Sequence, residues 1–208
     1  MESLAANSGE HAEAGRPPGL RERSKARRRA QIQRTAMRLF AERGYDSATV
    51  ADIADAAEVA PRTVTGYFQS KADLALSYAD ETATRLTEAF TTHPDTAFLD
   101  VVDLWLREEE RLLDPVTAAL ANAMYEANPS IRALSSAQVA RAFEVAIAAL
   151  VAEVGRQADD PVMVVCSATA PAAVAAYLAI LSQGGASGEF HQSFMAYLRS
   201  IIDAARAG

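Results

Sequence analysis

Apolar residues recur at the spacing of α-helices along almost the whole chain. Ile32, Ala36, Leu39 and Phe40 form one such stripe, which predicts a helix over residues 24–43 that ends at Gly44. Similar stripes predict helices over residues 50–57, 61–68, 71–90, 98–112, 116–126, 130–156, 161–183 and 188–206. No segment alternates apolar and polar residues as a half-buried strand does, and the sequence shows no internal repeat. The pattern therefore predicts an all-α fold.

Capping residues delimit the short helices of the first half. Thr49 can cap the first short helix, and Pro61 suits the first position of the second. Only a brief turn at residues 58–59 separates the two. Ser70 and Asp73 have the spacing of a capping box at the start of the long helix that follows. The predicted order is a long helix, two short helices with a tight turn, and a second long helix.

Composition excludes several classes of protein. Half of the 208 residues are apolar, which is enough for a sizeable core and excludes wholesale disorder. A single cysteine excludes an internal disulfide and a cysteine-based zinc site, and the three histidines lie far apart. No apolar signal segment opens the chain, so we expect a cytoplasmic, nucleoid-associated protein without a cofactor.

The net charge of −7 hides an asymmetry between the two parts of the chain. Residues 1–71 carry a balance of +3, whereas residues 72–208 carry −10. Nine basic residues and only two acidic ones fall between Arg21 and Arg43. A basic front on an acidic body indicates a polyanionic partner at one end. The alternative interpretation is a solvated helix face.

Two short helices joined by a tight turn and preceded by a basic helix are the parts of a DNA-binding helix-turn-helix. The major groove of a duplex admits one helix, and the second short helix carries small polar groups. Arg62 can donate to a guanine edge, and Thr63 and Thr65 can contact bases or phosphates. Tyr67 and Lys71 are placed to bind phosphate, although the ring of Tyr67 could instead pack against a neighbouring helix.

The basic arm before the motif is a further candidate for DNA contact. Arg27 and Arg28 lie in the arm, which spans residues 21–29. The arm could follow phosphates or enter the adjacent minor groove, and the alternative is again a solvated helix end.

The segment AERGYDSATVADIADAAEVAPRTVTGYFQSKADL resembles the N-terminal signature of the TetR family of bacterial transcription regulators. That signature has a glycine after the first helix, a threonine cap, an Ile-Ala pair, a valine turn and a final Tyr-Phe-x-x-Lys. This chain supplies them in order, as Gly44, Thr49, Ile53, Ala54, Val59, Tyr67, Phe68 and Lys71. The resemblance covers about residues 24–74.

The resemblance implies a role for each matching position. The helix that begins at Pro61 would enter the major groove. Thr49 would anchor the preceding helix, over residues 50–57, and contact a phosphate. The residues expected at the DNA are then Thr49, Pro61, Arg62, Thr63, Thr65, Tyr67 and Lys71. The chain departs from the family pattern at three positions. Ala60 replaces a frequent serine cap, Thr65 stands where many relatives have tyrosine, and Gly66 costs about 1 kcal/mol relative to alanine inside a helix.

A palindromic operator requires two such motifs about 34–36 Å apart, and therefore a homodimer. Residues 162–181 form an uncharged run of transmembrane length. Pro171, the many alanines and the missing aromatic and basic flanks argue against a membrane partner. We instead expect a dimer interface, with purely intramolecular packing as the alternative. Its candidate residues are Ala168, Ala172, Ala176, Phe194, Leu198 and Ile201.

The remaining helices are candidates for enclosing a small-molecule effector. Large side chains that could line a pocket are Tyr78, Trp105, Met124, Tyr125 and Phe143. The alternative is that these side chains form an ordinary core. Arginines such as Arg132 could pair an anionic effector. Residues 124–150 resemble actinobacterial relatives thought to sense acyl-CoA-like ligands, so we expect such a ligand or another apolar or anionic one.

These observations predict three parts: a disordered tail over residues 1–20, a three-helix helix-turn-helix domain over residues 21–71, and a larger helical domain for effector binding and dimerisation over residues 72–208. The expected function is a ligand-responsive, TetR-like repressor that binds double-stranded operator DNA. The alternatives are an activator, an effector-independent regulator, or a helical enzyme or carrier with a vestigial helix-turn-helix. No phosphate loop, nucleophile elbow or metal triad occurs, so we expect no enzymatic activity.

Overall fold

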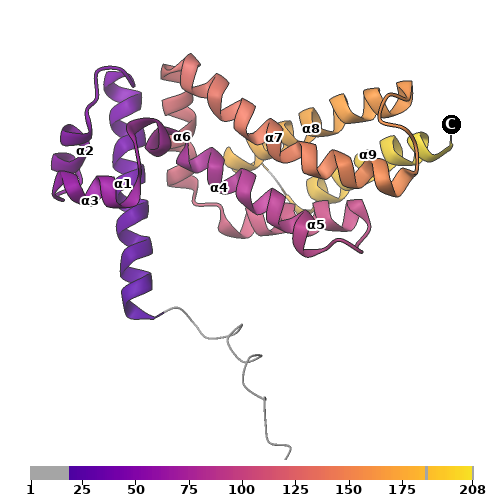
Figure 1. Cartoon of the computed structure of the whole chain (residues 1–208), viewed down its shortest axis with the longest axis horizontal. Helices are drawn as coiled ribbons and strands as arrows, with labels where there is room; N and C mark the ends of the chain where they lie inside the picture. Colours follow the sequence, from indigo (N-terminus) through magenta and orange to yellow (C-terminus); the bar gives the residue numbers. More distant parts are fainter. Residues whose placement is uncertain (1–18, 186, 208) are drawn as a thin grey trace, which may run out of the picture.

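The structure is a computed structural model that describes residues 19–185 and 187–207. Those residues form nine α-helices and contain no strand, which confirms the all-α fold (Figure 1). Residues 1–18 of the expected tail lie outside the described part of the chain. Leu20, the last residue assigned to that tail, already belongs to the first helix.

Three helices form the N-terminal unit. They are α1 (Leu20–Arg43), α2 (Val50–Ala56) and α3 (Pro61–Tyr67). α1 begins earlier than residue 24, because the Glu22 carboxylate accepts a hydrogen bond of 2.9 Å from the Gly19 N–H and closes the helix end. Gly44 ends α1 with a φ of 82°, a conformation that favours glycine.

Six longer helices form the body. They are α4 (Lys71–Thr92), α5 (Phe98–Leu112), α6 (Pro115–Ala127), α7 (Pro129–Val154), α8 (Pro161–Ser182) and α9 (Gly188–Ala207). Asp114 and Asp160 cap α6 and α8 ahead of a proline at the first position, so local chemistry sets both starts. α4 leaves the N-terminal unit and packs along α7, while α6 packs along α1 (Figure 1).

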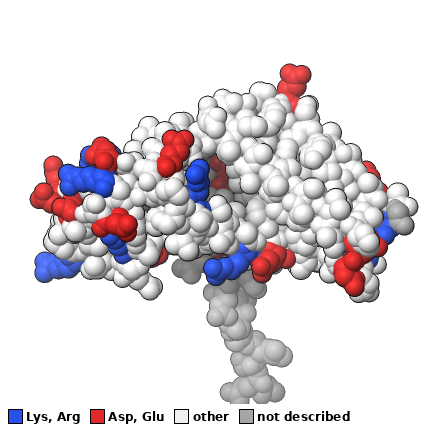
Figure 2. Space-filling model, turned by 90° about the horizontal axis from the view of Figure 1, so that it is seen from above, with Lys and Arg blue, Asp and Glu red and all other residues white. Residues whose placement is uncertain are grey.

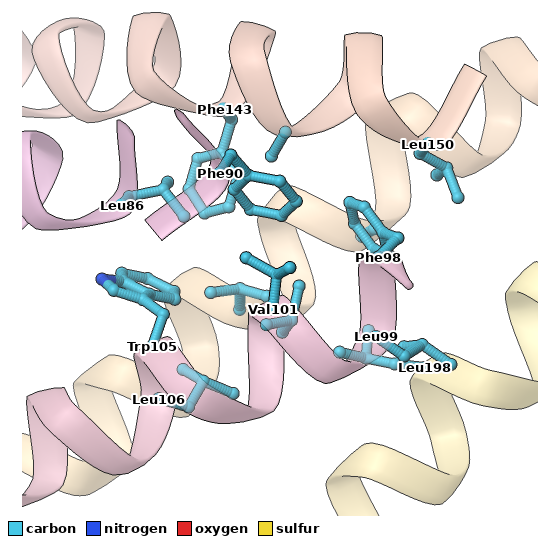
Figure 3. Close-up of a cluster of buried hydrophobic side chains, with 14 of the residues drawn as sticks. Leu86, Phe90, Phe98, Leu99, Val101, Trp105, Leu106, Phe143, Leu150 and Leu198 are labelled. Carbon is cyan, nitrogen blue, oxygen red and sulfur yellow. The ribbon is translucent and has the colours of Figure 1, made fainter. Parts of the chain in front are cut away.

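Two clusters of buried apolar side chains stabilise the molecule. The body core joins α4, α5, α7, α8 and α9, with Leu86, Phe90, Trp105 and Phe143 near its centre (Figure 3). The rings of Trp105 and Phe143 meet edge to face, with centroids 6.4 Å apart.

The other cluster, the N-terminal core, unites α1, α2, α3 and the start of α4. Its members include Ile32, Phe40 and Ile53. Met124 from α6 and Ile131 from α7 complete it, both at most 3% exposed. The body therefore supplies part of the hydrophobic core of the N-terminal unit, and the two parts share buried surface.

α8 is the one helix in the described ranges that is long and apolar enough, by length and composition, to cross a membrane. One of its faces is buried in the body core through Met163, Val174 and Tyr177. Val165, in contrast, is 59% exposed, although its helix carries no charged side chain between Pro161 and Ser182. An apolar helix with one exposed face is incompletely buried by this chain alone.

Candidate nucleic-acid interface and ligand cleft

α3 separates its outward and inward side chains cleanly. Arg62, Thr65 and Gly66 are exposed at positions i, i+3 and i+4, and they share one face of the helix. Val64 and Phe68 are at most 2% exposed and anchor the opposite side in the N-terminal core. The face predicted to meet DNA is thus free of contacts that hold the fold together.

Thr63 and Tyr67 lie at the flanks of this outward face. Both are half-buried, and the ring of Tyr67 packs against the N-terminal core. The ring of Tyr67 therefore packs against neighbouring helices, as the alternative interpretation of this residue predicted. Pro61 occupies the first position of α3, and Ala60 supplies no side-chain cap, as the departure from the family pattern predicts.

Thr49 caps α2 through a closed set of hydrogen bonds with Asp52. The Thr49 side chain accepts from the Asp52 N–H at 3.1 Å and donates to the Asp52 carboxylate at 2.5 Å, while the Thr49 N–H donates to the same carboxylate at 2.8 Å. These bonds lower the pKa of Asp52. The predicted anchoring role of Thr49 has a direct structural basis in this cap.

Lys71 departs from its predicted role at phosphate. Its ammonium donates to the main-chain carbonyls of Tyr45 at 2.9 Å, Asp46 at 3.4 Å and Ala48 at 3.1 Å. It also lies 4.4 Å from the centroid of the Tyr45 ring. An ammonium has three donors, and all three serve the loop between α1 and α2. The structure therefore makes Lys71 a residue that closes this loop, and the phosphate contact is not available to it in this arrangement.

The basic arm is a free helical extension. Residues 19–28 are exposed on every side, and this end of α1 projects beyond α2 and α3 (Figure 1). Arg27 and Arg28 are exposed and have no ion-pair partner among the described residues. Arg29 differs, because it pairs with Glu81 of α4 and lies 4.8 Å from the centroid of the Phe68 ring. The arm that can reach a polyanion therefore ends at Arg28.

A cleft of about 780 Å³ opens between α1 and the body. Its walls come from α1, α4, α6, α7 and α8 and from the end of α5. Three of the five predicted pocket residues line it, namely Tyr78, Tyr125 and Phe143. The volume is in the range that protein pockets use for drug-sized ligands.

The other two predicted pocket residues are wrong. Trp105 is 2% exposed within the body core, and Met124 is fully buried in the N-terminal core. Both lie on helices that contribute to the cleft, but their side chains are buried in the two hydrophobic cores and do not line it. These two residues instead belong to the ordinary hydrophobic cores, which was the alternative interpretation.

Several residues that sequence reasoning missed link the cleft to the N-terminal unit. Gln33 of α1 donates to Ser77 at 2.9 Å and to Glu81 at 3.1 Å, and both Gln33 and Glu81 line the cleft. Arg34 pairs with Asp114 across the same cleft at 3.5 Å. No sequence spacing joins residues this far apart, so only the packing of α1 on α4 and α6 shows these contacts.

Asn128, at the junction of α6 and α7, forms a second link. Its side-chain NH₂ donates to the carbonyls of Phe40 at 2.9 Å and Met124 at 2.8 Å, while its side-chain oxygen accepts from the Tyr45 N–H at 2.6 Å. Asn128 is 7% exposed. A single buried amide thus joins the end of α1 to the body.

Comparison with known proteins agrees with this geometry. Residues 32–78 match the model of the bacterial regulatory proteins of the tetR family. The chain is also 48% identical over 60 residues to the HTH-type transcriptional regulator TcmR of Streptomyces glaucescens. The N-terminal unit is therefore similar to that of the TetR family regulators. The match to that relative covers 29% of this chain and only about a quarter, 26%, of the relative.

Solved structures extend the likeness to the fold of the whole chain. A TetR family transcription regulator from Marinobacter aquaeolei matches with a TM-score of 0.52 at 16% identity, covering 89% of this chain and 98% of that one. The fatty acid degradation regulator FadR from Bacillus halodurans matches with a TM-score of 0.50 at 19% identity, covering 87% and 95%. A TetR-type N-terminal unit and a helical body therefore occur together in this fold.

The face of α8 that could pair two TetR-type chains differs in part from the prediction. Ala168, Ala172 and Ala176 are exposed, but Ala172 also lines the cleft. Phe194 and Leu198 are at most 9% exposed in the body core, so their inclusion in an interface is wrong.

Ile201 of α9 is half-buried. The large apolar side chains that this chain leaves exposed on α8 and α9 are Val164, Val165, Ile180 and Tyr197. On the face shown in Figure 2, a broad part of the body surface is free of charged side chains.

Proposed function

We propose that the protein is a sequence-specific transcriptional regulator that binds a palindromic operator as a homodimer. The observation that carries this proposal is the outward face of α3 within a TetR-type unit. Arg62 offers two parallel donors to a guanine edge, and Thr63 and Thr65 offer hydroxyls to bases or phosphates. Arg27 and Arg28 add sequence-independent contacts to phosphates along the duplex.

The uncharged face of α8 supports the homodimer. Val165 and Ile180 are exposed in the single chain, together with the small residues Ala168 and Ala176 between them. Burying such a face against the same face of a second chain removes apolar surface from water and buries no unpaired charge. Two-fold pairing of α8 and α9 would place the two α3 helices to meet successive major grooves.

We propose that a small molecule in the cleft controls DNA binding. The cleft touches α1 through Gln33 and Arg34, so a ligand that prefers one spacing of α1 and α4 shifts the orientation of the N-terminal unit. Release of the operator on ligand binding makes the protein a repressor. In an activator, ligand binding would act through the same contacts but would strengthen operator binding. The proposed regulator is a cytoplasmic protein and not an enzyme.

Selection of bound fragments from a randomised duplex pool tests the DNA-binding proposal. We expect enrichment of a palindrome, and Arg62→Ala should weaken binding to it by about 1–3 kcal/mol while relaxing preference at one base pair of each half-site. Arg141→Ala, at an exposed arginine of α7, is the matched control. Recovery of no enriched sequence would contradict the proposal.

A further inference from the structure

All but one of the charged side chains that line the cleft are already paired with an opposite charge. The Arg85 guanidinium donates to both carboxylate oxygens of Glu109, at 2.5 and 2.8 Å, and Glu109 is 8% exposed. Arg34 pairs with Asp114 at 3.5 Å. The remaining carboxylate, Glu81, is held by Arg29 and by Gln33. A charged ligand would have to displace one of these partners and leave its opposite charge unpaired in a partly buried site.

Arg132 is the one arginine lining the cleft without an ion-pair partner among the described residues. It is exposed, so its charge is solvated and attracts an anion only weakly. Arg107 and Arg111 are paired with Asp103 and Glu108, and they lie outside the cleft, as does Arg141. The charges of the cleft therefore favour neither an anion nor a cation.

Uncharged polar groups supply the unmet hydrogen bonds. The Tyr125 hydroxyl is buried and makes no hydrogen bond of standard geometry among the described residues, with the Ser135 side chain beside it, and Tyr125 lines the cleft. Burial raises the pKa of Tyr125 to about 12, so this group is a neutral phenol that can donate and accept. Burial and the nearby Glu109 also raise the pKa of Tyr78. A buried hydroxyl without a partner is costly, and a ligand oxygen would satisfy it.

Most of the remaining lining is apolar, and its other polar side chains are uncharged: Thr82, Thr117, Asn122, Ser135, Ser136 and Ser182. Val139 and Phe143 of α7 face Leu178 of α8, and the small residues Ala172 and Ala175 leave the volume between them open. This wall suits a rigid hydrophobic frame, because it offers area but few hydrogen bonds. The polar part of the lining would therefore bind a polar group of the ligand, and the apolar part would bind its hydrophobic frame.

We propose that the cleft binds an uncharged, mostly apolar molecule with a hydroxyl or carbonyl oxygen that hydrogen-bonds to Tyr125. This inference rests on the proposed role of the cleft as the effector site and names the chemical class of the effector. Among the expected ligands, which were acyl-CoA-like, apolar or anionic, it favours a neutral and mostly apolar one.

Three probes on one biphenyl frame test the proposal: 4-phenylphenol, 4-phenylbenzoate and 4-phenylbenzylamine, which are neutral, anionic and cationic at pH 7.4. Binding to the full-length protein is measured by isothermal titration calorimetry. We expect 4-phenylphenol to bind at least about tenfold more tightly than either charged probe. Tyr125→Phe should weaken 4-phenylphenol binding about three- to tenfold, since it deletes one hydrogen bond. Thr91→Val, which removes an exposed hydroxyl of α4 outside the cleft, should leave it unchanged.

Tighter binding of 4-phenylbenzoate, abolished by Arg132→Ala, would overturn the proposal in favour of an anionic ligand. Equal affinity of all three probes, no binding of 4-phenylphenol, or no response to Tyr125→Phe would overturn it as well. Operator binding by the probe-free protein is measured in parallel. If it persists when the probe tests fail, the ligand class is wrong while the proposed DNA-binding function stands.

Discussion

Single residues of the N-terminal unit divide into those that hold the fold and those that face outward. Lys71 shows why residue type alone does not decide between the two. A lysine at the end of a helix-turn-helix is a natural phosphate ligand, yet here its ammonium closes the loop between α1 and α2. Gly66, on the outward face of α3, is the opposite case, because it contributes no contact at all.

Gly66→Ala is expected to stabilise the protein. A Cβ at this position meets no atom within 4 Å, and alanine lowers the free energy of a helix interior by about 1 kcal/mol relative to glycine. Urea unfolding should show the increase. Gly44→Ala is the control, and it should destabilise, since the φ of 82° strains any residue with a side chain. An unchanged midpoint for Gly66→Ala would contradict the helical geometry of α3.

Lys71→Met separates a structural role from a role at phosphate. The substitution keeps the stem but removes the donors to three carbonyls, so we expect a decrease of about 1–3 kcal/mol in the free energy of unfolding. The slope of operator affinity against salt concentration should stay as in the unchanged protein. The double change Arg27→Ala and Arg28→Ala should instead flatten that slope, by about 0.9 for each phosphate that the arm no longer neutralises. A flattened slope for Lys71→Met would show that Lys71 contacts a DNA phosphate after all.

Elements of the body are joined by a buried polar chain that links α5, α8 and α9. The Tyr177 hydroxyl lies 2.7 Å from His191 Nδ1, and His191 Nε2 lies 2.6 Å from the Asp103 carboxylate. His191 is 3% exposed. Sequence spacing gave no partner for His191, because its partners lie on two other helices. A satisfied buried chain of this kind specifies how the three helices pack.

The free energy of unfolding should fall in acid, below the ordinary aspartate pKa of 3.8. Burial alone would raise the pKa of Asp103, but hydrogen bonds from Arg107 and His191 outweigh it and lower that pKa. A carboxylate with a lowered folded-state pKa stabilises the fold above its unfolded pKa, and this contribution disappears as pH falls through the folded value.

Urea unfolding between pH 7 and pH 3 measures this dependence. Asp103→Asn should make the fall between the two pH values smaller. Asp46→Asn alters an exposed carboxylate without an ion-pair partner in the described chain and should leave the dependence unchanged. An unaltered pH dependence for Asp103→Asn would show that the Asp103–His191 pair contributes nothing to it.

At the scale of the whole molecule, the two parts of the chain are mechanically connected. Met124 and Ile131 of the body complete the N-terminal core, and Asn128 joins the end of α1 to the junction of α6 and α7. Movement of α6 or α7 around a ligand therefore acts directly on α1. A pair of chains would convert that movement into a changed distance between the two α3 helices.

Ala176→Glu is expected to convert the proposed dimer into a monomer. Ala176 lies on the exposed, uncharged face of α8, and two copies of a charge facing each other there would be buried without partners. Sedimentation equilibrium should show the mass of one chain, and operator affinity should fall sharply because two-fold binding is abolished. Ala152→Glu, at an exposed position of α7, should change neither. A dimeric Ala176→Glu protein would exclude this face as the interface.

What could be predicted from the sequence is local. Thr49, Pro61, Asp114 and Gly44 set helix ends through contacts within a few residues, so the boundaries of the helices follow from spacing and capping. The outward face of α3 follows in the same way, since Val64 and the positions around it obey the helical period.

Tertiary structure alone decided which helix faces meet. Periodicity marks an apolar stripe but does not say which helix covers it, so Tyr125 could be placed at the cleft no more securely than Met124, which lies one residue before it and is buried elsewhere. The pairing of Arg85 with Glu109 and the link from Asn128 to Phe40 join residues far apart in the chain. Such contacts depend on the three-dimensional packing of whole helices, and the charge balance of the cleft depends on them.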